Sequence, residues 1–343
     1  MPKLKLSYKP FTLELKHTFT VSVFSRTVTP IVLTEVEYDG LIGYGEASMP
    51  AYLGETQETI MEFLSKVDLS KYNDVFNLEN ILKDIDLIEN GNTAAKASID
   101  IALHDLAGKM LNKPWYEIWG MDLRNIPYTS FTIGIDDKGM IEKKVKEAED
   151  FKILKVKLGR DNDRDIIHTI REITDVPLIV DINQGWKDKV LALEMIYWLK
   201  ERKVILVEQP LPKESIDETV WLTEKSPLPV IADESVQRLP DIIKIKDAFS
   251  GINIKLMKCT GMHEAYKMIK LAKELNLKIM LGCMTETSCG ISAASHLSPL
   301  ADWVDLDGAF LIKNDVFKGA ELINGKIFPA EFPGIGVKKI YKN

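Results

Sequence analysis

The sequence predicts an α/β fold whose main part is a (β/α)8-type barrel, joined to an α+β capping domain formed by the N-terminal third and the C-terminal tail. From about residue 128 onward, eight short β-rich runs alternate with helical segments, which is the element order of such a barrel. The first third instead shows a strand meander followed by helical patterns. A doubly wound open sheet is the alternative, but its first strand would need a glycine-rich phosphate loop that this sequence lacks.

The strands of the capping domain are predicted from alternating apolar and polar residues. Residues 4–19 and 30–38 alternate in this way, and this period of two gives a strand one buried and one exposed face. Asp39-Gly40 then marks a tight turn into residues 41–44. We therefore expect a hairpin at this point.

The clearest helix of the capping domain is predicted after Asn92-Thr93. These two residues are of the kind that caps a helix N-terminus with a side-chain oxygen. The apolar residues that follow recur at helical spacing and are expected to share one buried face: they are Ile99, Leu103, Leu106 and Met110.

The barrel strands are predicted at eight runs that are separated by helical segments. They are residues 131–135, 154–158, 178–182, 204–207, 230–232, 252–256, 278–281 and 303–306. The predicted domain boundaries follow from this pattern. They give a capping domain over 1–126, a catalytic barrel over 127–317, and a C-terminal return over 318–343 that packs on the capping domain.

Composition and charge exclude several classes of partner. The 343 residues are 45% apolar and carry a net charge of −7, without a basic run interleaved with aromatic residues, so nucleic acid is not an expected partner. No apolar stretch is long enough to span a bilayer, and no signal peptide is recognisable. The three cysteines show no metal-site spacing, which favours reduced thiols and a cytoplasmic location.

Acidic residues end three successive barrel strands, where catalytic groups of such barrels lie. Asp181, Glu208 and Asp233 follow one another at intervals of about 25 residues, the length of one strand–helix unit. Any one of them alone would read as a loop residue or a helix cap. Three carboxylates at one barrel mouth would repel each other unless a cation lies between them. Oxygen ligands without histidine favour Mg²⁺.

Lysines lie near the ends of the predicted strands that come before and after the three strands with acidic ends. Lys155 and Lys157 are two residues apart, so both face inward if either does, and Lys255 comes from the strand across the barrel. Two ammonium groups so close are expected to lower the pKa of one of them toward neutrality, which would create a base. The alternative is a lysine that only pairs with a carboxylate of the metal site. The arrangement suits proton removal from one face of a carbon and return to the other.

Several segments of the chain resemble the enolase superfamily, in its muconate-lactonising-enzyme-like branch. They are residues 97–109 (ASIDIALHDLAGK), 155–157 (KVK), 181–186 (DINQGW), 207–210 (VEQP), 232–235 (ADES) and 253–256 (NIKL). The resemblance covers nearly the whole chain and implies that Lys157 and Lys255 are the acid/base pair, with Lys155 assisting. It also implies one Mg²⁺ per subunit, for which Mn²⁺ is expected to substitute, bound by Asp181, Glu208 and Asp233.

Within that branch, the chain is most similar to dipeptide epimerases, especially those acting on L-Ala-D/L-Glu. The resemblance implies that Asp305 and Asp307, after the eighth strand, hold the α-ammonium group of a dipeptide. It further implies that Arg26 binds the side-chain carboxylate of glutamate, a bidentate role that suits its guanidinium group. Thr132 and Met284 are expected to line the same site. Barrels of this branch commonly form homo-oligomers, and we expect one here.

Three other functions remain as alternatives. An o-succinylbenzoate synthase or a muconate cycloisomerase would use the same metal site and lysines, but neither needs the acid pair after the eighth strand. A non-catalytic binding module on a barrel scaffold would not need the complete set of ligands and lysines. The sequence therefore favours 1,1-proton transfer at the α-carbon of the C-terminal residue of a dipeptide.

Overall fold

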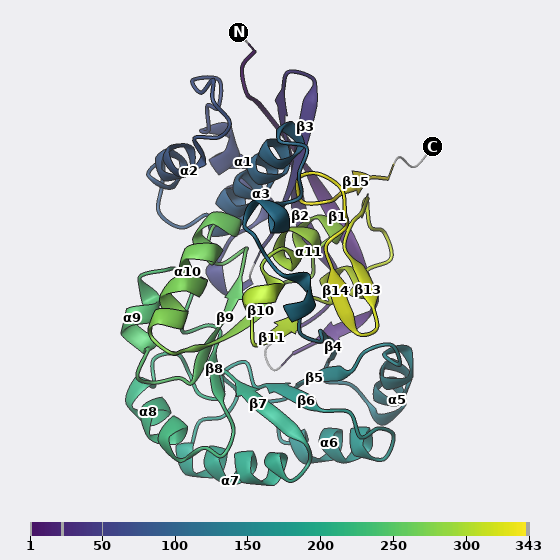
Figure 1. Ribbon diagram of the computed structural model, residues 1–343. Helices are drawn as coiled ribbons and strands as arrows, with labels where there is room; N and C mark the ends of the chain where they lie inside the picture. The colour runs from purple at the N-terminus through teal and green to yellow at the C-terminus, as the bar shows by residue number, and fades with distance from the viewer. Residues whose placement is uncertain (1, 22–23, 50, 341–343) are drawn as a thin grey trace.

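The capping domain is built on an antiparallel sheet of three strands. The computed structural model describes residues 2–21, 24–49 and 51–340. The sheet has the order β1 (Lys5–Thr20), β2 (Ser25–Tyr38), β3 (Leu41–Ser48), and it lies at the top of Figure 1. The predicted hairpin is confirmed, because Asp39 and Gly40 both have positive φ, 50° and 79°, in the turn from β2 to β3.

The helix α3 (Thr93–Met110) packs across this sheet, and its environment differs from the prediction in two ways. It is buried on nearly all sides rather than along one face, because the cap sheet covers one side and the barrel another. The Asn92 side chain makes no capping bond. Instead, Glu55 Oε1 accepts the Ala94 N–H at 3.2 Å and the Thr93 hydroxyl at 3.1 Å. The remaining cap helices are η1 (Ala51–Leu53), α1 (Gln57–Ser65), α2 (Leu78–Asp86), α4 (Trp115–Ile118) and η2 (Leu123–Asn125).

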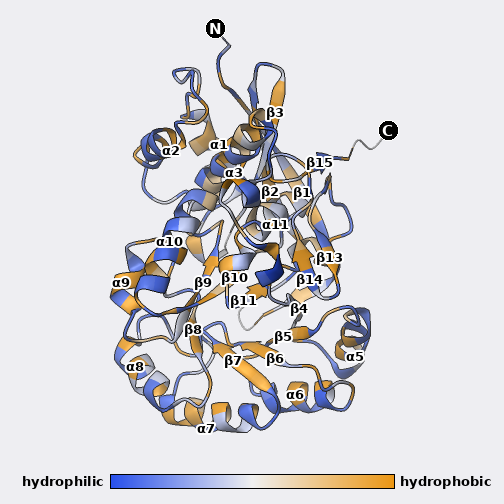
Figure 2. Ribbon diagram, viewed as in Figure 1, coloured by the Kyte–Doolittle hydropathy of each residue, from blue (hydrophilic) through white to orange (hydrophobic). Residues whose placement is uncertain are grey.

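Eight parallel strands form the barrel, one in each predicted run. They pair in chain order: β4 (Ser130–Ile133), β5 (Ile153–Lys157), β6 (Leu178–Asp181), β7 (Val204–Glu208), β8 (Val230–Ala232), β9 (Gly251–Lys255), β10 (Lys278–Gly282) and β11 (Trp303–Asp305). A parallel bridge between Thr129 and Val304 joins the first strand to the last and closes the ring. The strands are largely hydrophobic in Figure 2, as expected for strands covered on both faces.

Helices surround the barrel on its outer side (Figure 1). They are α5 (Lys138–Glu147), α6 (Asp163–Arg171), α7 (Lys189–Lys200), α8 (Ile216–Lys225), α9 (Asp241–Ile245), α10 (Met262–Glu274), α11 (Ser288–Ser295) and η3 (Ser298–Leu300). The short helix η4 (Gly308–Leu311) instead follows β11 at the carboxyl end of the barrel. Each strand–helix unit returns the chain to the same end of the ring. The carboxyl ends of all eight strands therefore open toward the same side.

The C-terminal segment returns to the capping domain, beside which it lies in Figure 1. It contains two small antiparallel pairs, β12 (Phe317–Lys318) with β15 (Lys338–Lys339) and β13 (Glu321–Ile323) with β14 (Lys326–Phe328). Lys339 forms an ion pair with Glu35 of β2 at 2.5 Å, and the Ile335 N–H donates to Asp105 of α3 at 3.0 Å. These contacts agree with a C-terminal return, while the exact domain boundaries stay a prediction.

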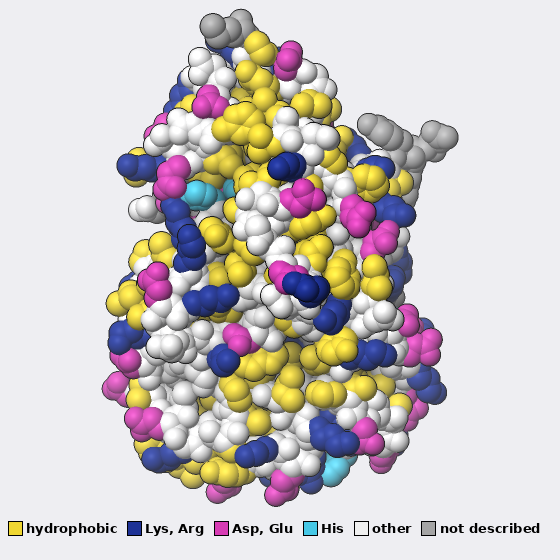
Figure 3. All heavy atoms as spheres, viewed as in Figure 1, with side chains coloured by type: hydrophobic (Ala, Val, Ile, Leu, Met, Phe, Trp, Pro, Cys, Tyr) yellow, Lys and Arg dark blue, Asp and Glu magenta, His cyan; other side chains and the backbone are white. Residues whose placement is uncertain are grey.

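None of the helices in the described part of the chain combines the length and the apolar composition that a bilayer span requires. On the face drawn in Figure 3, basic and acidic side chains are interspersed rather than gathered by sign.

Candidate active site

A cavity of about 310 Å³ lies at the carboxyl ends of the barrel strands, beneath the capping domain. Strands of both domains contribute to its wall, so residues far apart in the sequence meet there. Nine of the predicted site residues line it: Arg26, Thr132, Lys155, Lys157, Asp233, Lys255, Met284, Asp305 and Asp307. Asp181 and Glu208 are fully buried at the strand ends beside Lys155 and Lys157. The structure thus brings together every residue that the sequence singled out.

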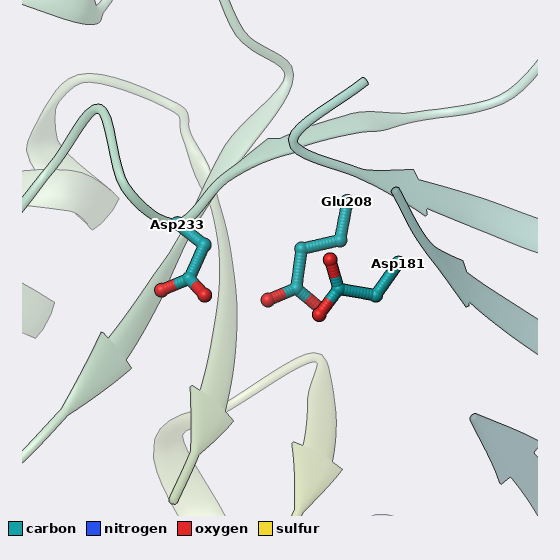
Figure 4. A group of neighbouring side chains, drawn as sticks. All are labelled: Asp181, Glu208 and Asp233. Atoms are coloured by element: carbon teal, nitrogen blue, oxygen red, sulfur yellow. The ribbon is translucent and has the colours of Figure 1, made fainter. Parts of the chain in front are cut away.

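The three acidic residues converge on one point (Figure 4). Asp181, Glu208 and Asp233 come from the ends of β6, β7 and β8, and each can offer one oxygen such that all three lie within 4.8 Å of one another. All three are no more than 1% exposed. Buried carboxylates at this spacing form a donor set of oxygens only, which fits a hard divalent cation such as Mg²⁺.

Buried lysines surround this cluster. Lys155 Nζ lies 2.7 Å from Glu208 Oε2, 2.8 Å from Asp305 Oδ2 and 3.4 Å from Asp181 Oδ2. Lys157 donates to Asp181 Oδ2 at 2.6 Å, on the β5 side of the cluster. From β9, across the ring, Lys255 donates to Asp233 Oδ2 at 2.7 Å.

The ionisation of the cluster departs from the sequence-based expectation in one respect. Burial disfavours the charge of Lys155, yet Asp305 and Glu208 outweigh burial and raise its pKa well above the usual value. Burial acts on Lys255 in the same way, and Asp233 likewise raises its pKa. The sequence predicted a lowered pKa for one of Lys155 and Lys157, but the pKa of Lys155 moves the other way because its ammonium group contacts the carboxylates of Glu208 and Asp305. Binding a cation to the carboxylates would weaken this effect.

Burial and the neighbouring charges shift the pKa values of two of the acids, Glu208 and Asp233, in opposite directions. Burial, followed by repulsion from Asp181, raises the pKa of Glu208 to about 7. Burial alone would also raise the pKa of Asp233, but Lys255 and Lys258 outweigh it and lower the value. Glu208 Oε2 is buried and pairs with Lys155 Nζ at 2.7 Å, although this contact lacks hydrogen-bond geometry.

The acid pair after the eighth strand faces the cavity next to β4. Asp305 Oδ1 accepts the Ser130 hydroxyl at 2.7 Å, and Asp307 Oδ2 accepts the Thr132 N–H at 2.6 Å. Burial, then repulsion from Asp305, raises the pKa of Asp307 to about 7. A cationic group placed between the two acids would be favoured, because it would relieve that repulsion.

Arg26 lies on the opposite, capping-domain wall. Its Nη2 donates to Thr285 Oγ1 at 3.0 Å, and its guanidinium group lies over the rings of Phe19 and Phe24, 5.7 and 5.4 Å from their centres. No carboxylate of the described residues pairs with it, and Nε has no hydrogen-bond partner among them. Burial lowers its pKa to about 10. Such a group can bind a carboxylate of a ligand.

Sequence reasoning gave no role to Lys258, Asn253 or Glu46, although all three are buried near the site. Lys258 contacts Asp233 and Asn253 contacts Glu208. The signal for Asn253 is its position two residues before Lys255 on the same strand, which places both on one face. Glu46 of β3 accepts the N–H groups of Thr287 and Gly290 and thereby joins the capping sheet to the loop after β10.

A closed ring of eight parallel strands, with three converging carboxylates and buried lysines at its carboxyl end, defines a barrel of the enolase type. Comparison with known families agrees with this class. A family described as enolase C-terminal domain-like matches residues 140–339, and the N-terminal domain of the mandelate racemase/muconate lactonizing enzyme family matches residues 10–120. The chain belongs to the mandelate racemase/muconate lactonizing enzyme family of the enolase superfamily.

Several proteins that are similar to this chain are named dipeptide epimerases. The chain is 58% identical to an L-Ala-D/L-Glu epimerase of Bacteroides thetaiotaomicron over 98% of this chain and 88% of that protein. It is similar in structure to the substrate-liganded L-Ala-D/L-Glu epimerase of Bacillus subtilis, with a TM-score of 0.92, 27% identity, and coverage of 98% and 99% of the two chains. A dipeptide epimerase of Enterococcus faecalis, in complex with Mg and L-Leu-L-Tyr, gives a TM-score of 0.89 at 32% identity over 98% and 99%.

Proposed function

We propose that this protein is a Mg²⁺-dependent dipeptide epimerase that inverts the α-carbon of the C-terminal residue, with L-Ala-L-Glu and L-Ala-D-Glu as its substrates. The observation that carries the proposal is the pair Lys157 and Lys255. These lysines contact opposite ends of one carboxylate cluster, from strands β5 and β9, and line one cavity. A carbon held between them has one amine on each face, which is what inversion by proton removal and return requires.

Substrate binding is proposed to use the charges at the two ends of the cavity. Asp305 and Asp307 would hold the α-ammonium group of the dipeptide, which would relieve their mutual repulsion. Arg26, which has no carboxylate partner among the described residues, would bind the side-chain carboxylate of glutamate. These contacts fix the dipeptide at both ends and place its α-carbon between the lysines.

The proton transfer is then balanced within the protein and the substrate. One lysine, as a neutral amine, takes the α-proton, and the C–H bonding electrons form the carbon–carbon double bond of an enediolate. The other lysine, as an ammonium group, gives its proton to the opposite face of the carbon and restores the carboxylate. When bound by Asp181, Glu208 and Asp233, Mg²⁺ supplies electrostatic stabilisation of the second negative charge of the enediolate. Lys155 adds a positive charge beside the carboxylate cluster, since its ammonium group contacts Glu208 and Asp305.

The relatives support this proposal over its alternatives. A 58% identical protein is named an L-Ala-D/L-Glu epimerase, whereas relatives at 33% identity include a hydrophobic dipeptide epimerase of Enterococcus faecalis. Succinylbenzoate synthesis and muconate cycloisomerisation start from substrates without a free α-ammonium group. They would leave the buried pair Asp305 and Asp307 without a substrate group to bind.

Exchange of hydrogen with solvent tests the proposal. The protein is incubated with L-Ala-L-Glu and Mg²⁺ in D₂O and followed by ¹H NMR. We expect loss of the glutamate α-proton signal and appearance of L-Ala-D-Glu, with L-Ala-L-Leu reacting more slowly because it offers Arg26 no carboxylate. If neither exchange nor epimer is observed for any dipeptide, the proposed function is wrong.

A further inference from the structure

Lys258 is a completely enclosed lysine beside the carboxylate cluster. It is 1% exposed, and its Nζ donates to Asp233 Oδ1 at 2.5 Å. It also donates to three backbone carbonyls, those of Asp233, Asn253 and Val236, at 2.8, 2.9 and 3.0 Å. All four partners only accept hydrogen bonds, so they suit an ammonium group with three donors. Unlike Lys155, Lys157 and Lys255, Lys258 does not line the cavity.

The contact of Lys258 belongs to a pattern that all three carboxylates share. In each of them, one oxygen is held by a donor other than the three lysines that line the cavity. The Asn183 N–H donates to Asp181 Oδ1 at 3.0 Å, and Asn253 Nδ2 donates to Glu208 Oε1 at 2.7 Å. The other oxygens, Asp181 Oδ2, Glu208 Oε2 and Asp233 Oδ2, each lie within 2.7 Å of a lysine that lines the cavity.

We propose that Lys258 is a positioning residue that holds Asp233 through Oδ1, so that the cation is bound by Oδ2 alone. If the cation were bound by both oxygens of Asp233, Oδ1 would have to give up its charge-assisted hydrogen bond with Lys258. The buried Lys258 ammonium group would then lose its carboxylate partner. The same reasoning assigns Asp181 Oδ2 and Glu208 Oε2 as the other two ligand atoms. Three single-oxygen ligands leave coordination positions of an octahedral ion open, which a substrate carboxylate needs. This inference rests on the metal-binding part of the proposed function.

Metal affinity without substrate tests the role of Lys258. The variant K258M removes the donors and keeps an unbranched side chain of similar length. Loss of a group that holds a metal ligand typically weakens metal binding about 10- to 100-fold. We therefore expect the Kd for Mn²⁺, measured by electron paramagnetic resonance, to rise at least about tenfold. A Kd that stays within about twofold of the parent value in folded K258M would overturn the proposal.

Lys96 offers a matched control in the capping domain. It is 3% exposed and donates to Asp86 Oδ1 at 2.9 Å and to the carbonyl of Glu89 at 2.6 Å, away from the carboxylate cluster. K96M therefore removes the same kind of buried ammonium group. We expect it to lower the unfolding temperature without changing the Kd for Mn²⁺. An equal loss of affinity in K96M would show that destabilisation alone explains K258M.

The parent protein provides a second measurement if K258M does not fold. A crystal structure with Mn²⁺ is expected to show Asp233 binding through Oδ2 alone, with Oδ1 still on Lys258; binding through Oδ1 or through both oxygens would reject the inference. Its failure is separable from failure of the proposed function. Single-oxygen binding without hydrogen exchange on any dipeptide would reject only the epimerase. Exchange together with chelation by Asp233 would reject only the role of Lys258.

Discussion

The two walls of the cavity differ in how their charges are compensated. On the barrel wall, every lysine is within hydrogen-bonding distance of a carboxylate, as in the 2.6 Å contact of Lys157 with Asp181 and the 2.7 Å contact of Lys255 with Asp233. On the capping-domain wall, the Arg26 guanidinium group has a threonine hydroxyl and two aromatic rings, but no carboxylate among the described residues.

This difference separates the chemistry of the site from its selectivity. The groups proposed to move protons are positioned by the protein itself and need no substrate to reach their places, which is the condition for preorganised catalysis. Arg26 carries a buried charge whose desolvation is not offset by a counter-ion among the residues that the structure describes. A ligand that brings a carboxylate supplies that counter-ion. The barrel wall therefore sets the reaction, and the cap wall selects the substrate.

Replacing the lysines of the barrel wall should have the largest effect. In K157M and K255M, one face of the α-carbon loses its acid or base, and we expect turnover to fall at least about 1000-fold, within the range for a lost acid/base group. The Kd for Mn²⁺ should not rise, because both lysines contact the oxygens that are assigned to the cation, and their positive charges oppose its binding. Polarimetry or NMR measures turnover, and electron paramagnetic resonance measures metal binding. Epimerisation above a tenth of the parent rate in either variant would exclude the assigned role.

Replacing Arg26 should have a smaller and selective effect. For R26M we expect kcat/KM for L-Ala-L-Glu to fall about 10- to 100-fold, which corresponds to the loss of one charged hydrogen-bonding partner. The value for L-Ala-L-Leu should stay the same or rise, since that substrate has no carboxylate to pair. R26K keeps the charge without the bidentate geometry, so its kcat/KM for L-Ala-L-Glu should lie between the values for the parent protein and for R26M. A loss of equal size for both dipeptides would mean that Arg26 supports the fold of the cap rather than selectivity.

The barrel wall was predictable from the sequence, because its signals recur. Each strand is a short apolar run, and an ionisable residue ends several of them at nearly the same interval, as with Asp181, Glu208 and Asp233. Convergence follows from the geometry of parallel strands and needs no knowledge of individual contacts. The cap wall has no such repeat, so Arg26 was found only through resemblance to a family.

Three features could not be predicted from the sequence because they depend on contacts between distant segments: the burial of Lys258, the cap of α3 and the pKa of Lys155. Lys258 lies just beyond a strand end, where a lysine is usually solvated, and only the fold encloses it. Asn92 looked like a helix cap, but Glu55 supplies the capping oxygen from another loop. The pKa of either Lys155 or Lys157 was expected to fall because the two amines come from one strand. That of Lys155 rises, because three carboxylates from other strands contact its ammonium group.

The junction between the two walls contains a buried pair of acids, Glu46 and Glu286. Glu286 Oε1 accepts the Met284 N–H at 2.8 Å and so holds the loop whose Thr285 contacts Arg26. A Cβ on Gly290 would meet Glu286 Oε2 at 2.3 Å and Glu46 Oε1 at 2.5 Å, so the two carboxyl groups lie on the same side of that glycine. Burial raises the pKa of both, that of Glu286 to about 7, and their repulsion raises that of Glu46 further.

This pair should make stability fall as the pH rises. The folded protein keeps a proton on Glu286 up to about pH 7, whereas the unfolded chain loses it near its ordinary value of 4.5, so the folded state binds more protons in between. The stability that the raised pKa of Glu286 contributes is fully present below pH 4.5, and it is lost as the pH rises from 4.5 to about 7. For a single group the loss is on the order of 3 kcal/mol at most. Lys255 opposes this effect by favouring the charged form of Glu286.

The variant E286Q should flatten this dependence, because glutamine resembles the protonated acid and has no proton to lose. Unfolding temperatures measured from pH 5 to pH 8 at constant Mg²⁺ are expected to decline by a few degrees less in E286Q than in the parent protein. E201Q is the control, since the Glu201 side chain is 77% exposed and its replacement should leave the parent curve unchanged. Parallel curves for the parent and E286Q would mean that the acid pair stays ionised when folded, and that the junction of the two walls does not depend on a shared proton.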